Sequence, residues 1–387
     1  MKKKQDTLIV TAGRDPEANF GILNPPVYHA STILYPTLDA VRTRKQPFTY
    51  GRRGTPTTAA LQEAIAELEG GYRTLLTPSG LSAVTAALLA HLKAGDHLLM
   101  TDSVYEPSRH FCERVLKRYG VEVEYYDPCL GRGISALVKP NTAVVFAESP
   151  GSVTFEVQDI PAIAEAAHKA GAIVMLDNTW ASPLYFKPFE HGVDISIQAV
   201  TKYLCGHSDA MMGAITTTEA AWRETVASHG ANGLCAGPDD VYLVLRGIRT
   251  LSVRLARHME TGLKLARWLE KRPEVARVIH PALPSHPGHA LWKRDFTGAS
   301  GLFSIELKLA SEAALAAMLD GLELFGMGYS WGGFESLIIP QDPVKIRTAT
   351  RWDAQGPMLR LHAGLEDPDD LIADLDAGFE RLRACNE

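Results

Sequence analysis

Short apolar runs alternate with amphipathic segments along most of this 387-residue chain. An apolar run of four to eight residues is typical of a strand buried on both faces, whereas apolar positions spaced three and four residues apart predict a helix. The predicted strands are 97–101, 121–126, 143–148, 172–176 and 195–199, and the predicted helices are 57–69, 81–92, 107–119 and 160–170. Strands separated by helices indicate an α/β fold, a three-layer sandwich with a mostly parallel sheet.

The same pattern divides the chain into three parts. Residues 1–55 are rich in Pro and Gly loops, which predicts an irregular arm. Residues 56–245 hold the strand and helix alternation of a large domain. One long or broken helix over 239–269 leads into a smaller C-terminal α/β domain, 246–387, in which we predict strands at 302–308 and 336–339 and helices at 311–319 and 368–383.

Charge and cysteine usage exclude several classes of protein. The net charge of −6 gives no electrostatic footprint for nucleic acid or an anionic membrane, and no apolar run approaches the roughly 20 residues of a membrane span. The five cysteines are an odd number, lie far apart and form no C-x-x-C, so reduced thiols in a cytoplasmic protein are expected. No metal site is predicted either, because His286 and His289 lie among Pro and Gly without other ligands nearby.

Two polar residues follow predicted strands, where an α/β sheet binds its ligands. Lys202 comes just after the strand 195–199 and before a Gly-His-Ser-Asp loop. A lysine at such an edge suits Schiff-base formation with a carbonyl, which points to pyridoxal phosphate. Asp177 follows the run 172–176, where a carboxylate could keep a pyridine nitrogen protonated. A loop-capping aspartate explains Asp177 equally well.

Two further segments could hold the ring and phosphate of such a cofactor. Gly80 opens the helix 81–92, and free backbone N–H groups at a helix N-terminus favour a phosphate. Tyr105 follows the strand 97–101, where an aromatic ring can stack on a flat cofactor. A plain helix cap and a half-buried loop tyrosine are the alternatives.

Arginines supply candidate anion sites. Tyr50, Arg52 and Arg53 share one loop, and a guanidinium offers paired donors to phosphate. Arg360 lies in an apolar, strand-like run, where its charge needs a partner such as a substrate carboxylate. A solvated loop and a structural salt bridge are the respective alternatives.

Six motifs occur in one order between about residues 20 and 380. They are Tyr50-Gly51-Arg52-Arg53-Gly54-Thr55, Glu148-Ser149-Pro150-Gly151-Ser152, Asp177-Asn178-Thr179-Trp180-Ala181, Thr201-Lys202-Tyr203-Leu204, Tyr329-Ser330-Trp331-Gly332-Gly333 and Arg360-Leu361-His362. With these motifs the chain resembles the Cys/Met-metabolism family of pyridoxal-phosphate enzymes. The resemblance implies the fold-type-I, aspartate aminotransferase-type architecture and pyridoxal 5'-phosphate as cofactor.

The resemblance also implies a role for each site residue. Lys202 looks like the Schiff-base lysine, Asp177 like the pyridinium partner and Tyr105 like a stacking and catalytic tyrosine. The phosphate ligands within the subunit would be Gly80, Leu81 and Thr201. Tyr50 and Arg52 would reach the phosphate of a neighbouring subunit, which implies a homo-oligomer, usually a tetramer. The substrate carboxylate would be bound by Arg360, with Ser330 and Trp331 beside it.

The chain departs from the family pattern at two places, and the second departure bears on the expected activity. Many relatives have a serine phosphate ligand where this chain has Ala199, so that contact is not carried over. The γ-synthase and γ-lyase branches commonly read Glu-Ser-Pro-x-Asn-Pro where this chain has Gly151-Ser152-Val153 after Pro150. This second departure, together with Ser330-Trp331-Gly332-Gly333, favours the β-lyase branch of the family, which cleaves L-cystathionine to homocysteine, pyruvate and ammonia. Alternatives are a γ-synthase, a γ-lyase, a cysteine desulfhydrase or a non-catalytic regulatory protein on this scaffold.

Overall fold

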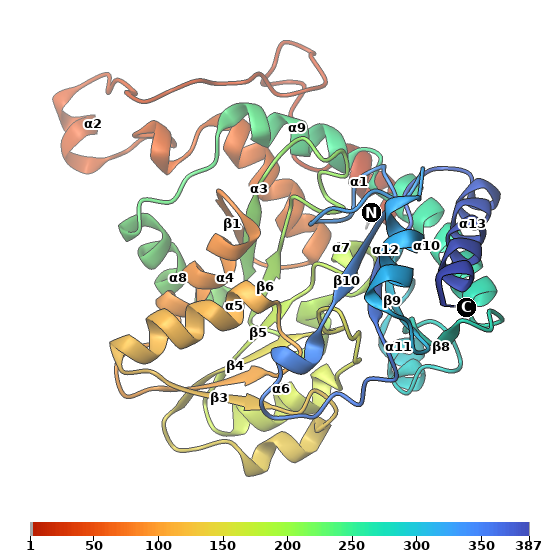
Figure 1. The fold of residues 1–387 in the computed structure, drawn as a ribbon. Coiled ribbons are helices and arrows are strands. Elements are labelled where there is room, and N and C mark those ends of the chain that lie inside the picture. The colour runs from red at the N-terminus through yellow and green to blue at the C-terminus, as the bar shows by residue number, and fades with distance from the viewer. Residues whose placement is uncertain (1–2, 387) are drawn as a thin grey trace.

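Two sheets organise the molecule in the computed structural model, which describes residues 3–386 (Figure 1). The larger sheet has seven strands in the order β1-β7-β6-β5-β4-β2-β3, and only β7 runs antiparallel to its neighbours. The strands are β1 (Arg73–Thr77), β2 (His97–Thr101), β3 (Glu122–Tyr126), β4 (Thr142–Glu148), β5 (Ile173–Asp177), β6 (Ile195–Gln198) and β7 (Gly213–Thr217). The predicted α/β fold class is confirmed.

Helices cover both faces of this sheet, so its inner strands are largely buried. All five residues of β2 and all four of β6 are buried. The helices of this part are α3 (Pro56–Glu69), α4 (Gly80–His91), α5 (Glu106–Phe111), α6 (Ile160–Lys169), α7 (Ser182–Tyr185), α8 (Glu219–Ala231) and α9 (Pro238–Ile248). The predicted helix over 107–119 continues past α5 as a π turn and a 3-10 turn, Cys112–Leu116 and Lys117–Tyr119.

The C-terminal sheet is smaller and antiparallel, with the order β10-β11-β9-β8. Its strands are β8 (Val275–Ile279), β9 (Leu302–Leu307), β10 (Leu337–Gln341) and β11 (Met358–His362). The helices are α10 (Leu251–Leu269), α11 (His289–Asp295), α12 (Glu312–Asp320) and α13 (Pro368–Asn386). The predicted helix 239–269 is thus broken between α9 and α10. The proposed domain boundary after residue 245 lies within α9 and remains a prediction.

The prediction of an irregular arm over 1–55 was wrong in part. Its described residues contain α1 (Gln5–Thr11) and α2 (Leu38–Thr43), while residues 1 and 2 lie outside the described part. Helix α1 has a single buried residue, Ile9, which packs in the cluster formed by α3 and α9. Helix α2 lies far from the two sheets, on the part of the chain that projects from the body (Figure 1).

Strands β1 and β7 were missed because their sequences are rich in threonine and lack a long apolar run. The two strands pair with each other, and the buried hydroxyls of Thr74 and Thr216 are 2.7 Å apart across them. A polar residue buried in this way is satisfied by its neighbour strand, which no local pattern reveals. Among the helices of residues 3–386, none is long and apolar enough to cross a lipid bilayer.

Candidate active site

The carboxyl ends of the parallel strands converge on a cavity of about 420 Å³ between the two sheets. Asp177 ends β5, Tyr105 follows β2, and Lys202 lies in the turn after β6. Arg360 enters from β11 of the smaller sheet. The structure brings together nine of the predicted site residues, which are Gly80, Leu81, Tyr105, Asp177, Thr201, Lys202, Ser330, Trp331 and Arg360.

Lys202 is held by the loop that follows α12. Its Nζ donates a hydrogen bond of 2.6 Å to Ser330 Oγ and lies 5.2 Å from the ring centroid of Trp331. Burial, together with the positive charge of Arg360, lowers the pKa of Lys202 to about 8, although Asp177 opposes the shift. A lysine with this pKa exchanges protons near neutral pH, as a general base must.

The loop at Ser330 is shaped by left-handed backbone. Ser330 has φ +82° and Gly332 has φ +88°. A Cβ at Gly332 would lie 3.0 Å from the backbone of Lys202, so this turn sits directly against the lysine. The carbonyl of Ser330 accepts a 3.1 Å hydrogen bond from Arg360 Nη2, and the same serine therefore contacts both the lysine and the arginine.

A second carboxyl group lies beside Asp177. Glu148 ends β4 and is paired with Asp177 in the register of β4 and β5. Its Oε2 accepts the backbone N–H of Tyr105 at 2.7 Å. Burial, and then the negative charge of Asp177, raises the pKa of Glu148 well above its ordinary value. Glu148 therefore orients the tyrosine loop, a role that the sequence reasoning missed although Glu148 carries the same strand-end signal as Asp177.

Asp177 is held in place by the residues of its own loop. The backbone N–H and the hydroxyl of Thr179 both donate to Asp177 Oδ1, at 3.0 and 2.5 Å. Burial raises the pKa of Asp177, while these hydrogen bonds and Lys202 act in the opposite direction. A carboxylate buried here is stabilised further by a cationic partner, such as a protonated pyridine nitrogen.

The N-terminus of α4 forms one wall of the cavity. Ser79 caps the helix by accepting the N–H of Ser82 at 3.1 Å, and this leaves the first-turn amides of Gly80 and Leu81 as donors for an anion. A Cβ at Gly80 would lie 2.6 Å from the Cβ of Ala199, so the helix start approaches the end of β6 closely. Thr201 lines the cavity, but its hydroxyl also bonds the backbone N–H and carbonyl of Met212.

Arg360 and Tyr105 face the open part of the cavity. Burial lowers the pKa of Arg360, and the guanidinium stays charged. Tyr105 is 45% exposed, and its pKa is raised by burial and by the charges of Glu148 and Asp177. The arginine can bind an anionic group, and the aromatic ring can stack on a flat one.

Tyr50 and Arg52 are not brought to this cavity within one chain. Tyr50 is 46% exposed, and Arg52 Nη1 donates to the carbonyl of Gly230 at 3.0 Å. Arg52 lines a separate pocket of about 70 Å³ with residues of α8. Their expected role toward a neighbouring subunit therefore remains a prediction.

One group among the described residues could hold a metal ion. His97, Glu122 and Glu124 place their ligand atoms within 4.8 Å of one another, at the amino ends of β2 and β3. The ammonium of Lys139 lies 2.6 Å from each carboxylate and already occupies a position between them. This group is at the opposite end of the strands from Lys202.

The donor set of the cavity fits pyridoxal phosphate. Lys202 offers an amine, Asp177 a buried carboxylate for the ring nitrogen, and the start of α4 offers amides for the phosphate. The cavity volume is within the range of about 300–1,000 Å³ that is usual for small-molecule sites.

Comparison with known proteins agrees with this chemistry. Residues 6–380 match the family described as Cys/Met metabolism PLP-dependent enzyme. The chain is 48% identical to the cystathionine beta-lyase of Salmonella typhimurium and 48% identical to that of Escherichia coli, each over 98% of this chain and 99% of the relative.

A solved structure shares the fold over nearly the whole chain. It is cystathionine gamma synthase from Xanthomonas oryzae pv. oryzae in complex with aminoacrylate and cysteine. The TM-score is 0.91 at 34% sequence identity, and the match covers 99% of this chain and 100% of the other.

Proposed function

The chain belongs to the Cys/Met metabolism family of pyridoxal-phosphate-dependent enzymes, and from this membership we infer that it is a carbon–sulfur lyase that cleaves L-cystathionine. The products are homocysteine, pyruvate and ammonia. The structural observation that supports this inference is that Lys202, with its lowered pKa, the buried Asp177 and Arg360 line one and the same cavity. The roles of the individual residues, given next, are part of the proposal.

Four residues would hold the cofactor. Lys202 would bind it covalently, Asp177 would keep its ring nitrogen protonated, and Gly80 with Leu81 would donate amides to its phosphate. When bound, pyridoxal phosphate supplies an electron sink for the negative charge that develops at the substrate Cα. Glu148 supports this arrangement by holding the backbone of Tyr105.

Arg360 and Lys202 would act on the substrate. Arg360 would bind the α-carboxylate with paired N–H donors and so fix the direction of the Cα–H bond. Lys202 Nζ would take the α-proton, and Ser330 Oγ, 2.6 Å away, keeps the amine directed at this point. The Cβ–S bond then breaks, and the departing thiolate receives a proton from Lys202 or Tyr105.

Product identification from L-cystathionine tests the assignment. We expect pyruvate with homocysteine in equal amounts. Formation of 2-oxobutyrate with cysteine would instead identify a γ-lyase. A protein that stays colourless when pyridoxal phosphate is added would point to a non-catalytic role on this scaffold.

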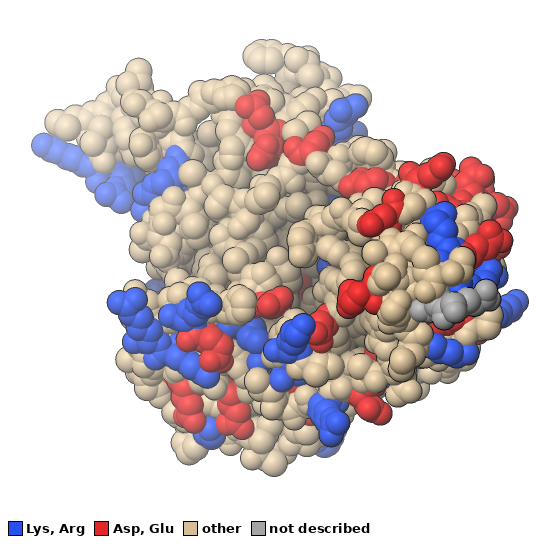
Figure 2. Space-filling view, in the orientation of Figure 1, with Lys and Arg blue, Asp and Glu red and all other residues tan. Residues whose placement is uncertain are grey.

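The arm suggests how chains assemble. Phe20 is 99% exposed and Leu34 is 85% exposed, which is costly for large apolar side chains in water. Beside the arm, the visible face carries few charged residues, whereas Lys, Arg, Asp and Glu are interspersed over the rest of it (Figure 2). We therefore propose a homo-oligomer, a tetramer built from dimers, in which Tyr50 and Arg52 complete a neighbour's site.

Mixed oligomers test the shared site directly. Arg52→Ala and Lys202→Ala chains are each expected to be nearly inactive. If the site is shared, co-refolding the two variants creates some sites with both residues intact, and activity returns. No recovery in mixed oligomers confirmed by light scattering would contradict the shared site.

A further inference from the structure

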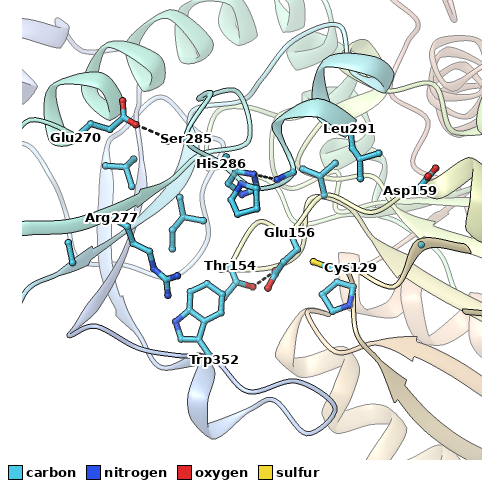
Figure 3. A pocket seen from close by; sticks show the side chains of 18 of the residues that line it. Cys129, Thr154, Glu156, Asp159, Glu270, Arg277, Ser285, His286, Leu291 and Trp352 are labelled. Atoms are coloured by element: carbon cyan, nitrogen blue, oxygen red, sulfur yellow. Dashed lines mark hydrogen bonds between the residues drawn. The ribbon is translucent and has the colours of Figure 1, made fainter. Parts of the chain in front are cut away.

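A second cavity, larger than that of Lys202, lies between the two parts of the chain. Its volume is about 720 Å³, within the usual range for small-molecule sites. One wall comes from segments 128–131 and 154–159, and the other comes from β8 and segment 285–291 (Figure 3). Nothing in the proposed reaction uses this cavity.

The walls of the second cavity are mainly apolar. The aliphatic and proline residues are Pro128, Val157, Val275, Ala276, Val278, Ile279, Pro287 and Leu291. Trp352 adds an aromatic ring, over which the guanidinium of Arg277 lies at 4.3 Å from the centroid. An occupant with a flat apolar body would therefore gain contact area on several sides.

The charged residues of these walls already have partners. Glu156 pairs with Arg347 at 2.6 Å, Asp159 with Arg294 at 2.7 Å, and Arg277 with Glu306 at 2.7 Å. Glu270 accepts the hydroxyl of Ser285 at 2.5 Å. An anionic occupant would lose its hydration without gaining an unpaired cation, and a cationic one would meet only the exposed Glu270, which is already hydrogen-bonded to Ser285, so an uncharged occupant is favoured.

Several polar side chains also line this cavity. In Figure 3 the side chains of Thr154, Glu156 and Cys129 point into the space between the walls. The Thr154 hydroxyl donates to Glu156 at 2.6 Å, and the carboxylate keeps lone pairs that can accept a further hydrogen bond from an occupant. His286 is buried there, and burial lowers its pKa to about 4, so its ring is neutral.

We propose that this second cavity binds a small, uncharged, aromatic molecule that carries one N–H or O–H donor. The occupant lies between the apolar side chains of β8 and Val157, and its donor is directed at Glu156. Its binding is coupled to the Lys202 cavity, because one short loop forms part of both walls.

That loop is residues 151–157. Gly151, Val153 and Phe155 line the Lys202 cavity, whereas Thr154, Glu156 and Val157 line the second cavity. Val153 and Phe155 have φ of +69° and +54°, a backbone region that β-branched and bulky residues rarely adopt. Contacts on both sides of the loop hold this unfavourable backbone conformation in place. A ligand in one cavity therefore changes how freely the loop moves in the other.

Indole is a suitable probe, since it is neutral, aromatic and carries one N–H. Titration calorimetry on the complete enzyme should show one indole site per chain at roughly millimolar concentration. Benzoate, which is similar in size but anionic, should bind at least about tenfold more weakly, because its charge stays unpaired. The absence of indole binding, or equal binding of benzoate, would overturn the proposal.

Two variants locate the site. Leu291→Trp fills the cavity with an indole ring and should abolish the binding, whereas Leu309→Trp, at a position 91% exposed and outside both cavities, should leave it unchanged. Ala276→Phe enters the same cavity from an exposed strand position and serves if Leu291→Trp does not fold. Indole binding that survives in the folded variants would place the site elsewhere and contradict the proposal.

Alkylation of Cys129 gives an independent readout. Cys129 lines the cavity, and the exposed Cys235 does not. Indole should slow the reaction of Cys129 with iodoacetamide at least about threefold near saturation, and leave that of Cys235 unchanged. Equal rates at Cys129 with and without indole would contradict occupancy of this cavity.

The coupling between the two cavities rests on the proposed function, and a separate kinetic measurement tests it. Saturating indole should change the KM for L-cystathionine about fivefold in the wild type and not in Leu291→Trp. An unchanged KM with intact binding overturns the coupling. A protein that binds indole but does not cleave cystathionine overturns the proposed function and leaves the site standing.

Discussion

The two cavities differ in what their charged groups do. In the Lys202 cavity, Lys202, Asp177 and Glu148 lie together without a complete set of neutralising partners, and burial shifts the pKa of each. In the second cavity every charged side chain of the wall is paired or hydrogen-bonded. The second cavity is nevertheless the larger one, at about 720 Å³ against about 420 Å³.

This difference suits the Lys202 cavity to proton transfer and the second cavity to binding alone. Proton transfer requires groups whose pKa values are shifted toward the working pH, and burial beside charged neighbours supplies the shift. A cavity whose charged side chains are mostly held in ion pairs offers an occupant chiefly apolar contact. Volume alone would have selected the second cavity, which lacks the groups that the proposed reaction requires.

Removal of the lysine amine tests the comparison most severely. Lys202→Ala should lower the rate of cystathionine cleavage about 1,000-fold or more, since both the general base and the cofactor anchor are lost. The visible absorption of the bound cofactor should disappear as well. The exposed Lys271→Ala, near the second cavity, should match the wild type in both measurements. Normal turnover by Lys202→Ala would refute the assignment of the site.

The carboxylates of the two cavities form a matched pair of tests. Asp177→Asn should reduce kcat about 100-fold, because the neutral amide no longer stabilises a protonated ring nitrogen. Asp159→Asn should change kcat less than about twofold, since asparagine still caps α6 and only a partly exposed ion pair is lost. Similar losses in both variants would contradict the distinction drawn between the cavities.

The arginines provide a smaller contrast. Arg360→Lys keeps the positive charge but loses the paired donors, so kcat/KM for L-cystathionine should fall about tenfold, mainly through KM. Arg277→Lys, in the second cavity, should leave KM unchanged. Steady-state kinetics on both variants would show whether the substrate carboxylate meets Arg360. An unchanged KM in Arg360→Lys would remove that role.

The smallest expected effect is on stability in the cofactor-free protein. Because the folded-state pKa of Lys202 is lowered to about 8 from 10.5, the folded protein binds fewer protons than the unfolded chain between these values. The buried ammonium therefore lowers the free energy of unfolding below pH 8, and this loss of stability disappears as the pH rises from 8 to 10.5. Lys202→Met should remove this cost and stabilise the cofactor-free protein by about 1 kcal/mol at pH 7, after allowance for partial exposure.

Denaturant titrations at several pH values check this sign. The stability difference between Lys202→Met and the wild type should shrink as pH rises from 8 to 10. A difference that stays constant with pH would mean that the lysine is not desolvated in the fold.

Local patterns predicted the strands that carry the site. The strands β2, β4, β5 and β6 are short apolar runs, and their observed bounds differ from the predicted ones by at most one residue at each end. Strands β1 and β7 were missed because their polar threonines are satisfied only by each other. The helices of the arm were missed because Gly and Pro loops separate them.

The sequence by itself determined which single residues are candidates for the proposed chemistry. Lys202, Asp177 and Tyr105 were identified because each follows a strand, and strand ends of a parallel sheet meet at one edge. Covalent structure and local periodicity carry that information, so it can be read before folding is known.

Tertiary structure alone decided which residues act together. Lys202 meets Ser330 across 128 positions of sequence, and Glu148 acts beside Asp177 only because β4 and β5 pair in register. The second cavity exists because β8 faces the loop 151–157 of the other part of the chain. Burial and charge shift a pKa through space rather than along the chain, and for that reason the pattern of apolar positions could not reveal these groupings.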